Sequence, residues 1–292
     1  MKAGPVTDEL RAHITSLPGL QGYVHAFDKV ITHRRGVALL KGQIDGEAVG
    51  LKLVLPGAKP ADPYDPVEVL SREARWLSKY GAAVGATYAM DDGIARAETW
   101  LLMRWLAGAP ADRWWRTSQQ NPDVFALMAK RVTAIHALDQ VHGDLQPAHF
   151  LIAEDDVAII DFGLAHRPGS FNYRGAMIHF MAPEIAAALV GGKPVLLDPL
   201  AEVYSFAAVV YFIVTGELPT VYKGTSVAEK LQSIAHDGCI KRDELEAQLP
   251  EKTARCFAKC LSLNRAERIQ SMDDLITTLP MSRATLDHLL AF

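Results

Sequence analysis

The chain has 292 residues, of which 49% are hydrophobic and 22% are charged, and its formal net charge is −4. The length suits one domain of two lobes or two small domains, and the composition is that of a globular protein with a substantial core. The acidic balance offers no positive field to a nucleic acid or an anionic membrane. We find no leader-like apolar stretch and no apolar run long enough to span a bilayer. We therefore expect a cytoplasmic protein with no nucleic-acid partner and no membrane span.

The cysteine content excludes a disulfide framework. Only three cysteines are present, Cys239, Cys256 and Cys260. Cys256 and Cys260 are four residues apart, so a helix would place them on one face. No further pair of ligands lies near them, and the pattern favours buried thiols over a metal site.

Residues 1–22 predict a short N-terminal extension that contains one helix. Thr7 is suited to cap it, two acidic residues follow in its first turn, and Pro18-Gly19 would stop it. Leu10, Ile14 and Leu17 share one face of this helix. We expect that face to pack on the neighbouring lobe.

The next segments, residues 23–31, 37–44 and 47–55, read as three strands. Asp45-Gly46 between the second and third is a strong hairpin signal. The connection between the first and second ends in Arg34, Arg35 and Gly36. Farther along, residues 84–90 and 99–103 read as two more strands, separated by an Asp91-Asp92-Gly93 turn.

Lys52 and Glu73 are predicted to form an ion pair. Lys52 lies among apolar strand residues, where an ammonium is costly to bury unless it meets an anion. Pro66 is a suitable opener for a helix over residues 67–79. At 100° per residue, Glu73 falls within the apolar arc of that helix, whereas Glu68 lies on the opposite, charged side. Glu73, and not Glu68, is therefore the expected partner.

The stretch that organises the chain follows an apolar-periodic helix predicted over residues 124–139. A loop carries Asp144, an apolar run follows, then an acidic turn at residues 154–156, a second apolar run and Asp161. Two short strands joined by a tight turn would bring both carboxylates to one cleft. Such a pair suits proton acceptance at one carboxylate and divalent-metal binding at the other.

These two segments resemble motifs of the protein kinases. His142-Gly143-Asp144-Leu145 is similar to the start of the catalytic loop, and Asp161-Phe162-Gly163 is similar to the D-F-G metal motif. The resemblance implies an α+β, two-lobed protein-kinase-like fold. Its lobes would be a small antiparallel-sheet N-lobe at residues 23–104 and a mainly helical C-lobe at residues 105–292.

The resemblance also implies a role for each candidate residue. Asp144 would be the catalytic carboxylate that accepts the proton of the acceptor, and Asp161 would hold Mg²⁺ or Mn²⁺. Lys52, in a segment that resembles V-A-I-K, would be fixed by Glu73 at the phosphates of ATP.

Residues 101–108 resemble the kinase hinge. Met103 would limit the adenine pocket, and Leu106 would offer backbone groups to adenine.

Later motifs follow the same order. Met181-Ala182-Pro183-Glu184 resembles the close of an activation segment. Glu202 stands where kinases usually have aspartate, at the start of a buried central helix that Thr215-Gly216 ends. By the same resemblance, Arg268 would pair with Glu184 in a structural role.

Several positions depart from the kinase pattern. Of the glycine-rich phosphate loop only Gly36 remains, so either Arg34 and Arg35 supply the anion contacts or the loop binds nucleotide poorly. Gly143 replaces the arginine that usually pairs with an activation-segment phosphate, which argues against gating by phosphorylation. Gln146 replaces the catalytic-loop lysine.

His149 and Ala176 are two further departures. His149 stands where a metal-binding asparagine belongs, and imidazole suits Mn²⁺ better than Mg²⁺. A histidine after the aspartate is also similar to the catalytic loop of the bacterial lipopolysaccharide-core heptose kinases. Ala176 lacks the hydroxyl that normally contacts the catalytic aspartate.

The leading functional hypothesis is transfer of a phosphoryl group from ATP to a hydroxyl by a divergent protein Ser/Thr kinase. The activation segment and residues 181–184 favour a protein acceptor. A kinase of a sugar or another small molecule is a second hypothesis, favoured by His142-Gly143-Asp144 and His149. A pseudokinase that binds or regulates is a third, favoured by the missing glycines, Gln146 and His149. The expected partners are ATP and a protein or small-molecule acceptor that the sequence does not name.

Overall fold

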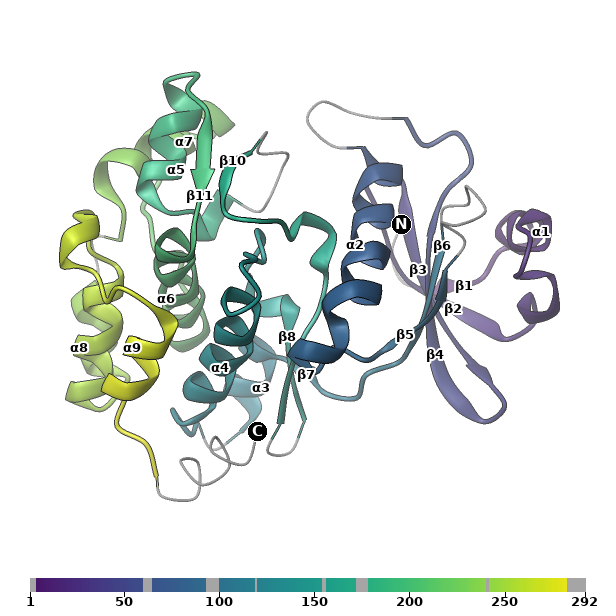
Figure 1. The fold of residues 1–292 in the computed structure, drawn as a ribbon, viewed down its shortest axis with the longest axis horizontal. Helices are drawn as coiled ribbons and strands as arrows, with labels where there is room; N and C mark the ends of the chain where they lie inside the picture. The colour runs from purple at the N-terminus through teal and green to yellow at the C-terminus, as the bar shows by residue number, and fades with distance from the viewer. Residues whose placement is uncertain are drawn as a thin grey trace. The chain divides into compact units, whose positions relative to one another are not determined.

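The chain folds into two compact units, seen in the computed structural model (Figure 1). The N-terminal unit comprises residues 1–106 and 162–164, and the C-terminal unit comprises residues 107–161 and 165–292. The residues whose structure is described are 4–59, 65–92, 100–118, 120–153, 156–171, 178–239 and 242–282. The sheet-rich first unit and the mainly helical second unit confirm the predicted α+β class.

One antiparallel sheet dominates the N-terminal unit, with strand order β1-β2-β3-β4-β6-β5. Its strands are β1 (Gly4–Pro5), β2 (Phe27–Arg34), β3 (Val37–Ile44), β4 (Glu47–Val54), β5 (Ala89–Asp92) and β6 (Trp100–Arg104). The helices of this unit are α1 (Asp8–Ser16) and α2 (Pro66–Tyr80). Asp45 and Gly46 join β3 to β4 with φ of 51° and 84°, so the predicted hairpin is present and has the positive φ angles of a tight two-residue turn.

Two predicted strands differ from the structure by more than one residue at an end. The first begins at Phe27 and not at residue 23, because residues 21–23 form a 3₁₀ helix. The strand predicted over residues 84–90 is wrong over most of its length, since Gly81–Val84 is a 3₁₀ helix and β5 begins at Ala89. Gly85, with φ of 70°, turns the chain out of that helix. Asp91 and Asp92 belong to β5 and not to the predicted turn, whose Gly93 lies outside the described residues.

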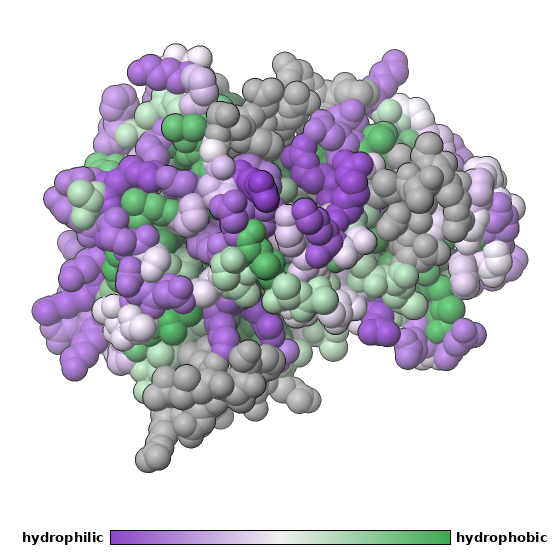
Figure 2. Space-filling model, viewed as in Figure 1, coloured by the Kyte–Doolittle hydropathy of each residue, from purple (hydrophilic) through white to green (hydrophobic). Residues whose placement is uncertain are grey.

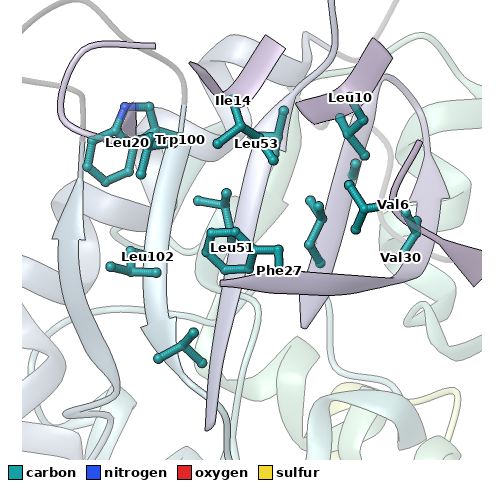
Figure 3. Close-up of a cluster of buried hydrophobic side chains, with 13 residues drawn as sticks. Val6, Leu10, Ile14, Leu20, Phe27, Val30, Leu51, Leu53, Trp100 and Leu102 are labelled. Atoms are coloured by element: carbon teal, nitrogen blue, oxygen red, sulfur yellow. The ribbon is translucent and has the colours of Figure 1, made fainter. Parts of the chain in front are cut away.

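Helix α1 is part of the core of the N-terminal unit. The Thr7 hydroxyl accepts a hydrogen bond from the backbone N–H of Leu10, which confirms the predicted cap. Val6, Leu10, Ile14 and Leu20 are buried against side chains of the sheet (Figure 3). Burial of apolar area at about 25 cal/mol per Å² makes these side chains a substantial part of the stability of the sheet.

The C-terminal unit contains seven helices within its described residues. They are α3 (Ala111–Thr117), α4 (Val124–His136), α5 (Pro183–Val190), α6 (Pro199–Thr215), α7 (Val227–Asp237), α8 (Glu251–Cys260) and α9 (Met272–Thr278). Helix α6 is the buried central helix, and it ends at Thr215 as predicted, with Gly216 in the left-handed conformation at φ of 75°. Helix α4 ends three residues before the predicted position 139, because residues 137–139 form a turn.

Two small sheets complete this unit. One consists of β7 (Ala109–Pro110), β8 (Phe150–Ala153) and β9 (Asp156–Ile159), and the other pairs β10 (Gly169–Phe171) with β11 (Val195–Leu197). Strands β8 and β9 are antiparallel, with Phe150 opposite Ile159. This pairing places the loop before β8 and the residues after β9 at the same end of the sheet, as predicted for Asp144 and Asp161.

The three cysteines are buried, which agrees with the prediction of buried thiols. Burial raises the pKa of the Cys256 thiol, which lies 3.6 Å from the carbonyl oxygen of Thr278. On the face seen in Figure 2, apolar residues of the described segments lie in small patches among polar ones. In the described part of the chain, no helix combines the length and apolar character needed to cross a membrane.

Candidate active site

The ammonium of Lys52 lies against the carboxylate of Glu73. Nζ is 2.7 Å from Oε1 and 2.8 Å from Oε2, and the Glu73 side chain is only 2% exposed. Glu68 instead pairs with Arg72 on its own helix and is 41% exposed. The choice of Glu73 over Glu68 as the partner of Lys52 is therefore confirmed.

The position of each partner follows from its element. Lys52 belongs to β4, between β3 and β6, and its neighbours Leu51 and Leu53 are fully buried on the opposite face. Glu73 belongs to α2, whose Trp76 stacks on Phe162 with ring centroids 4.0 Å apart and planes inclined by 8°. This stack fixes the rotational phase of α2, which directs Glu73 inward.

In the C-terminal unit, the carboxylate of Asp144 is held by its own loop. Gln146 donates a hydrogen bond from Nε2 to Asp144 Oδ2 at 3.0 Å. The backbone N–H of Asp144 lies 3.3 Å from Nδ1 of His142, whose Nε2 lies 3.1 Å from the carbonyl of Ile160. Burial is the main cause that lowers the pKa of His142, so its ring is neutral and accepts at Nδ1 while donating at Nε2.

The ring of His149 is directed at Asp161. Its Nδ1 lies 2.8 Å from the backbone carbonyl of Asp144, which only accepts, so Nδ1 carries a proton. Its Nε2 lies 3.3 Å from Asp161 Oδ2. Burial by itself lowers the pKa of His149, but the carboxylates of Asp161 and Asp144 outweigh it, and the pKa lies above its ordinary value. The sequence-predicted metal residues, His149 and Asp161, are thus brought together.

This pair fits a divalent metal ion. A histidine that ligates a metal usually donates its other ring N–H to a carbonyl or carboxylate, as Nδ1 does here. No group of three or more His, Cys, Asp or Glu side chains among the described residues is arranged to hold a metal. Two protein ligands completed by phosphate oxygens and water is the arrangement usual for Mg²⁺ at nucleotide sites.

Glu202, at the start of α6, holds the loop that carries Asp144. Its Oε2 accepts from the backbone N–H of His142 at 3.0 Å, and its Oε1 accepts from that of Gly143 at 2.7 Å. His136 adds a third contact, from Nε2 to Oε2 at 2.9 Å. Burial alone would raise the pKa of Glu202, but these donors, His136 first, hold it below its ordinary value. The carboxylate is therefore ionised and fully engaged.

A pocket lies beside Asp144. It is lined by Gly143, Asp144, Phe180, Met181, Glu202 and Ser205, among others. Residues near positions 144 and 181 are far apart in the sequence, and their meeting here gives the carboxylate a concave neighbourhood in which an acceptor group could be placed.

Comparison with known proteins decides the family. A family profile described as "Protein kinase domain" matches residues 98–289, which is more than half of the chain. The chain belongs to the protein kinase family.

Several curated kinases are similar to part of the chain. A probable serine/threonine-protein kinase of Clostridium acetobutylicum is 26% identical over 163 residues, which are 54% of this chain and 24% of that protein. The dual specificity protein kinase TTK of Mus musculus is 29% identical over 163 residues, 51% of this chain and 18% of that protein. The proto-oncogene serine/threonine-protein kinase mos of Sus scrofa is 37% identical over 91 residues, 29% of this chain and 25% of that protein. The kinase chain thus spans a quarter or less of the length of these relatives.

A tight turn lies where the kinase pattern has its glycine-rich loop. Arg35 and Gly36, at φ of 52° and 80°, connect β2 directly to β3, and Arg34 and Arg35 are exposed. A Cβ at position 36 would lie 2.8 Å from the Cβ of Ala58, which is too close. Packing within the unit therefore requires a residue without a side chain at this position. A role of these three residues in phosphate binding stays a prediction.

The two residues predicted to form the hinge lie at the end of β6 and just after it. Met103 is buried and is paired with Gly50 of β4, while Leu106 is half-buried after the strand. The backbone N–H of Trp105, between them, donates to the carbonyl of Ala48 at 2.8 Å. This bond fixes the chain direction at the point where adenine contacts are expected.

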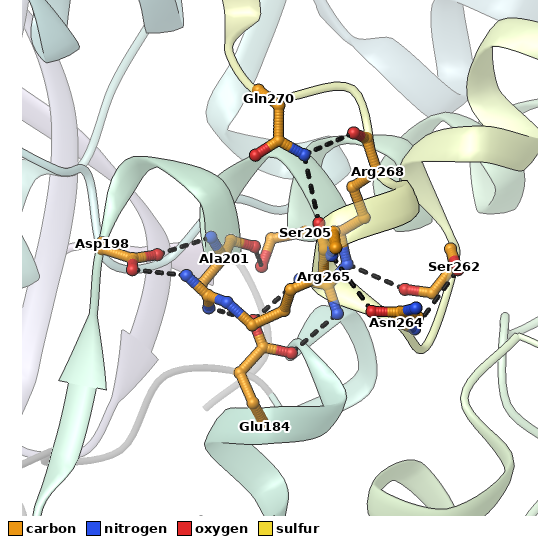
Figure 4. A network of polar contacts seen from close by, with 10 residues as sticks. Glu184, Asp198, Ala201, Ser205, Ser262, Asn264, Arg265, Arg268 and Gln270 are labelled. Atoms are coloured by element: carbon orange, nitrogen blue, oxygen red, sulfur yellow. Dashed lines mark hydrogen bonds and ion pairs between the residues drawn. The ribbon is translucent and has the colours of Figure 1, made fainter.

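Glu184, in the segment that resembles the close of an activation segment, belongs to an ion-pair network (Figure 4). Arg268, with its side chain fully buried, donates from both terminal nitrogens to the carboxylate of Glu184 at 2.7 Å, as predicted. Arg265 bridges Glu184 and Asp198 at 2.6 Å each. Bidentate arginine pairs of this kind fix geometry as well as charge. Ala176 and the rest of residues 172–177 lie outside the described residues.

Three contacts at and around the candidate site were not predicted from the sequence. They are the Gln146–Asp144 hydrogen bond, the His136–Glu202 contact and the bridge made by Arg265. For the His136–Glu202 contact, the only local signal was a polar residue, His136, at the end of the apolar helix α4. Its partner is 66 residues away, and no local pattern names it.

We expect Glu73→Gln to reduce turnover by roughly 100-fold, because Lys52 loses the charge that positions it. Glu68→Gln is the matched control, since it makes the same change on the same helix at an exposed position and should leave turnover within about twofold. Turnover and ATP affinity of both variants would be measured together. Equal losses in the two would contradict a role for the Lys52–Glu73 pair.

Proposed function

We propose that this chain transfers the γ-phosphoryl group of ATP to a serine or threonine hydroxyl of a protein. The observation that carries the proposal is the arrangement of Asp144, His149 and Asp161 within one loop system. Membership of the protein kinase family supports the same reaction class. We also propose that the lobes meet after residue 104, that the extension ends at residue 22, and that the protein is cytoplasmic.

In the proposed reaction, Asp144 orients the acceptor hydroxyl and takes its proton. The hydroxyl oxygen forms a bond to the γ-phosphorus, the bond from that phosphorus to the bridging oxygen breaks, and ADP leaves with the electron pair. Gln146 holds Oδ2 of Asp144 at 3.0 Å, which fixes the carboxylate plane before the acceptor arrives. Lys52, positioned by Glu73, contacts the phosphates.

Asp161 and His149 would hold the divalent ion. A bound ion neutralises charge on the phosphates as the phosphoryl group moves. The backbone carbonyl of Asp144 accepts a hydrogen bond from His149 Nδ1 and so orients the imidazole toward Asp161. One loop therefore positions both the proposed base and a proposed metal ligand. Imidazole is a softer ligand than the asparagine amide, so Mn²⁺ is the favoured ion.

A second candidate is a nucleotide-binding module that does not transfer phosphate. The tight turn at Arg35 and Gly36 favours it, because a two-residue turn offers few backbone N–H groups to a phosphate. The two candidates separate in one assay. Turnover of ATP with labelled phosphoprotein supports the kinase, turnover without phosphoprotein points to a small-molecule acceptor, and nucleotide binding without turnover supports the module.

The same assay tests the metal ligand. With Mn²⁺ and with Mg²⁺, wild-type turnover is expected to favour Mn²⁺, and His149→Asn should move the ratio toward Mg²⁺ by about tenfold. The amide keeps an oxygen for the ion, so turnover should survive. His136→Asn is the control, because that ring contacts Glu202 and no expected metal ligand. An unchanged Mn²⁺/Mg²⁺ ratio in His149→Asn would exclude the ligand role.

A further inference from the structure

A second group of polar side chains lies beside the site and takes no part in the proposed transfer. His179 Nδ1 is 2.7 Å from the hydroxyl of Tyr222, and the two ring centroids are 5.6 Å apart. The ammonium of Lys230 lies over the Tyr222 ring, 5.6 Å from its centroid. His179 comes from the 3₁₀ helix Ile178–Phe180, Tyr222 from the loop before α7, and Lys230 from α7. We name these three residues the His179 cluster.

The protonation of the cluster follows from its contacts. Burial raises the pKa of Tyr222 to about 12, so its hydroxyl keeps its proton. Burial, and then the charge of Lys230, lower the pKa of His179, so its ring is neutral near pH 7. With the Tyr222 hydroxyl donating to Nδ1, the neutral ring carries its hydrogen on Nε2. The cluster presents one ammonium and one imidazole N–H donor.

The positive charge of Lys230 is not matched by a carboxylate within ion-pair distance in the described segments. The nearby Lys223 differs, since its Nζ lies 2.8 Å from Asp237 Oδ2. Glu229, next to Lys230 in sequence, uses its carboxylate in the capping box with Ser226 at the start of α7. An ammonium over an aromatic ring, next to an imidazole that contacts the hydroxyl of the same ring, forms a site suited to an anion.

The cluster borders the pocket that contains Asp144. His179 directly precedes Phe180 and Met181, which line that pocket. Consecutive Cα atoms are about 3.8 Å apart, so the backbone of His179 is within one or two residue lengths of the pocket wall. A group held by the cluster would belong to the same acceptor as the hydroxyl at Asp144.

We infer that the His179 cluster is a subsite for an anionic side chain of the acceptor, either a carboxylate or a phosphorylated residue near the target hydroxyl. The inference rests on the proposed function for the hydroxyl itself. It gives the kinase a preference for acidic acceptors. An anionic side chain of the acceptor would form charge-assisted hydrogen bonds with Lys230 and His179. A lysine or arginine at that position of the acceptor would instead be repelled by the charge of Lys230, so the cluster favours acidic over basic acceptors.

The test uses the full chain and three serine peptides that differ only in flanking residues, which are glutamate, phosphoserine or lysine. Binding is measured by fluorescence anisotropy, and phosphorylation by label transfer from ATP. The glutamate and phosphoserine peptides are expected to bind about tenfold more tightly than the lysine peptide. Lys230→Glu should invert this order in favour of the lysine peptide, which loss of folding cannot produce. Comparison of the two anionic peptides, with inorganic phosphate as competitor, distinguishes the carboxylate from the phosphate.

Lys223→Gln is the matched control, because it removes a neighbouring charge that Asp237 already compensates, and it should leave the order unchanged. Equal binding of all three peptides, or an order that Lys230→Glu leaves intact, would overturn the subsite. Selective binding without label transfer would retain the subsite and refute the proposed kinase activity. Label transfer to all three peptides alike would support the proposed kinase activity and refute the subsite.

Discussion

Asp144→Asn is expected to lower turnover by about 100- to 10,000-fold while ATP affinity stays within about twofold. The amide keeps the shape of the carboxylate but cannot take the proton of the acceptor hydroxyl. Gln146 also donates to Asp144 Oδ2 at 3.0 Å, a contact that the oxygen of an asparagine can still accept. The loop should therefore keep its structure, and the loss should fall on the chemical step.

Turnover by label transfer and binding of a non-hydrolysable ATP analogue by calorimetry would be measured on the same preparation. Asp139→Asn is the control, since that side chain is 73% exposed and lies 3.9 Å from Arg167. It should behave as wild type in both measurements. Full turnover in Asp144→Asn would remove the basis for assigning phosphoryl transfer to this loop.

Glu202→Ala is expected to destabilise the protein by about 3–5 kcal/mol, the largest stability effect that we predict. The substitution removes the acceptor of two backbone N–H groups, those of His142 and Gly143, and of the His136 ring. The backbone N–H of His142 would remain buried, and those of Gly143 and the His136 ring partly buried, with no carboxylate to meet them. Since proteins are stable by only about 5–15 kcal/mol, this variant should melt at a much lower temperature.

The pH dependence gives this prediction a second readout. Because the donors around Glu202 hold its folded pKa below the ordinary value, its contribution is complete above the unfolded pKa, about 4.3, and is lost as the pH falls through the lower folded pKa. The difference in unfolding free energy between wild type and Glu202→Ala should thus be constant from pH 7 to about 5 and shrink in stronger acid. Glu246→Ala, at an exposed position, is the control and should cost less than about 0.5 kcal/mol. A difference that grows in acid would contradict the assigned role.

The sequence by itself determined the features that depend on local patterns. Helical periodicity placed Glu73 on the apolar side of α2 and Glu68 on the charged side. Because the Glu73 carboxylate is buried, it needs a cation, and Lys52 is that cation. Asp45-Gly46 specified a hairpin because few other residues accept positive φ. The order of the catalytic-loop, D-F-G and M-A-P-E segments indicated the family, which the comparison confirmed.

Local patterns were misleading where glycines and turns compete with apolar runs. Residues 84–90 look like a strand, but Gly81 and Gly85 allow a 3₁₀ helix and a left-handed turn that delay β5 to Ala89. At the first hairpin, Gly36 reads as a remnant of a phosphate loop. In the structure, a Cβ at position 36 would lie too close to Ala58, so packing requires glycine there, and no strand pattern predicts this requirement.

Apart from the Lys52–Glu73 and Arg268–Glu184 pairs, only the tertiary structure decided which polar side chains meet. Glu202 contacts His136 across 66 positions of the sequence, and Arg265 contacts Asp198 across 67. The same holds for His179 and Tyr222, which are 43 positions apart. Propensity and periodicity describe what a segment does with its near neighbours, whereas these contacts depend on how whole helices and loops pack. A buried charge such as that of Glu202 must meet a partner, but the sequence alone did not indicate that His136 would be that partner.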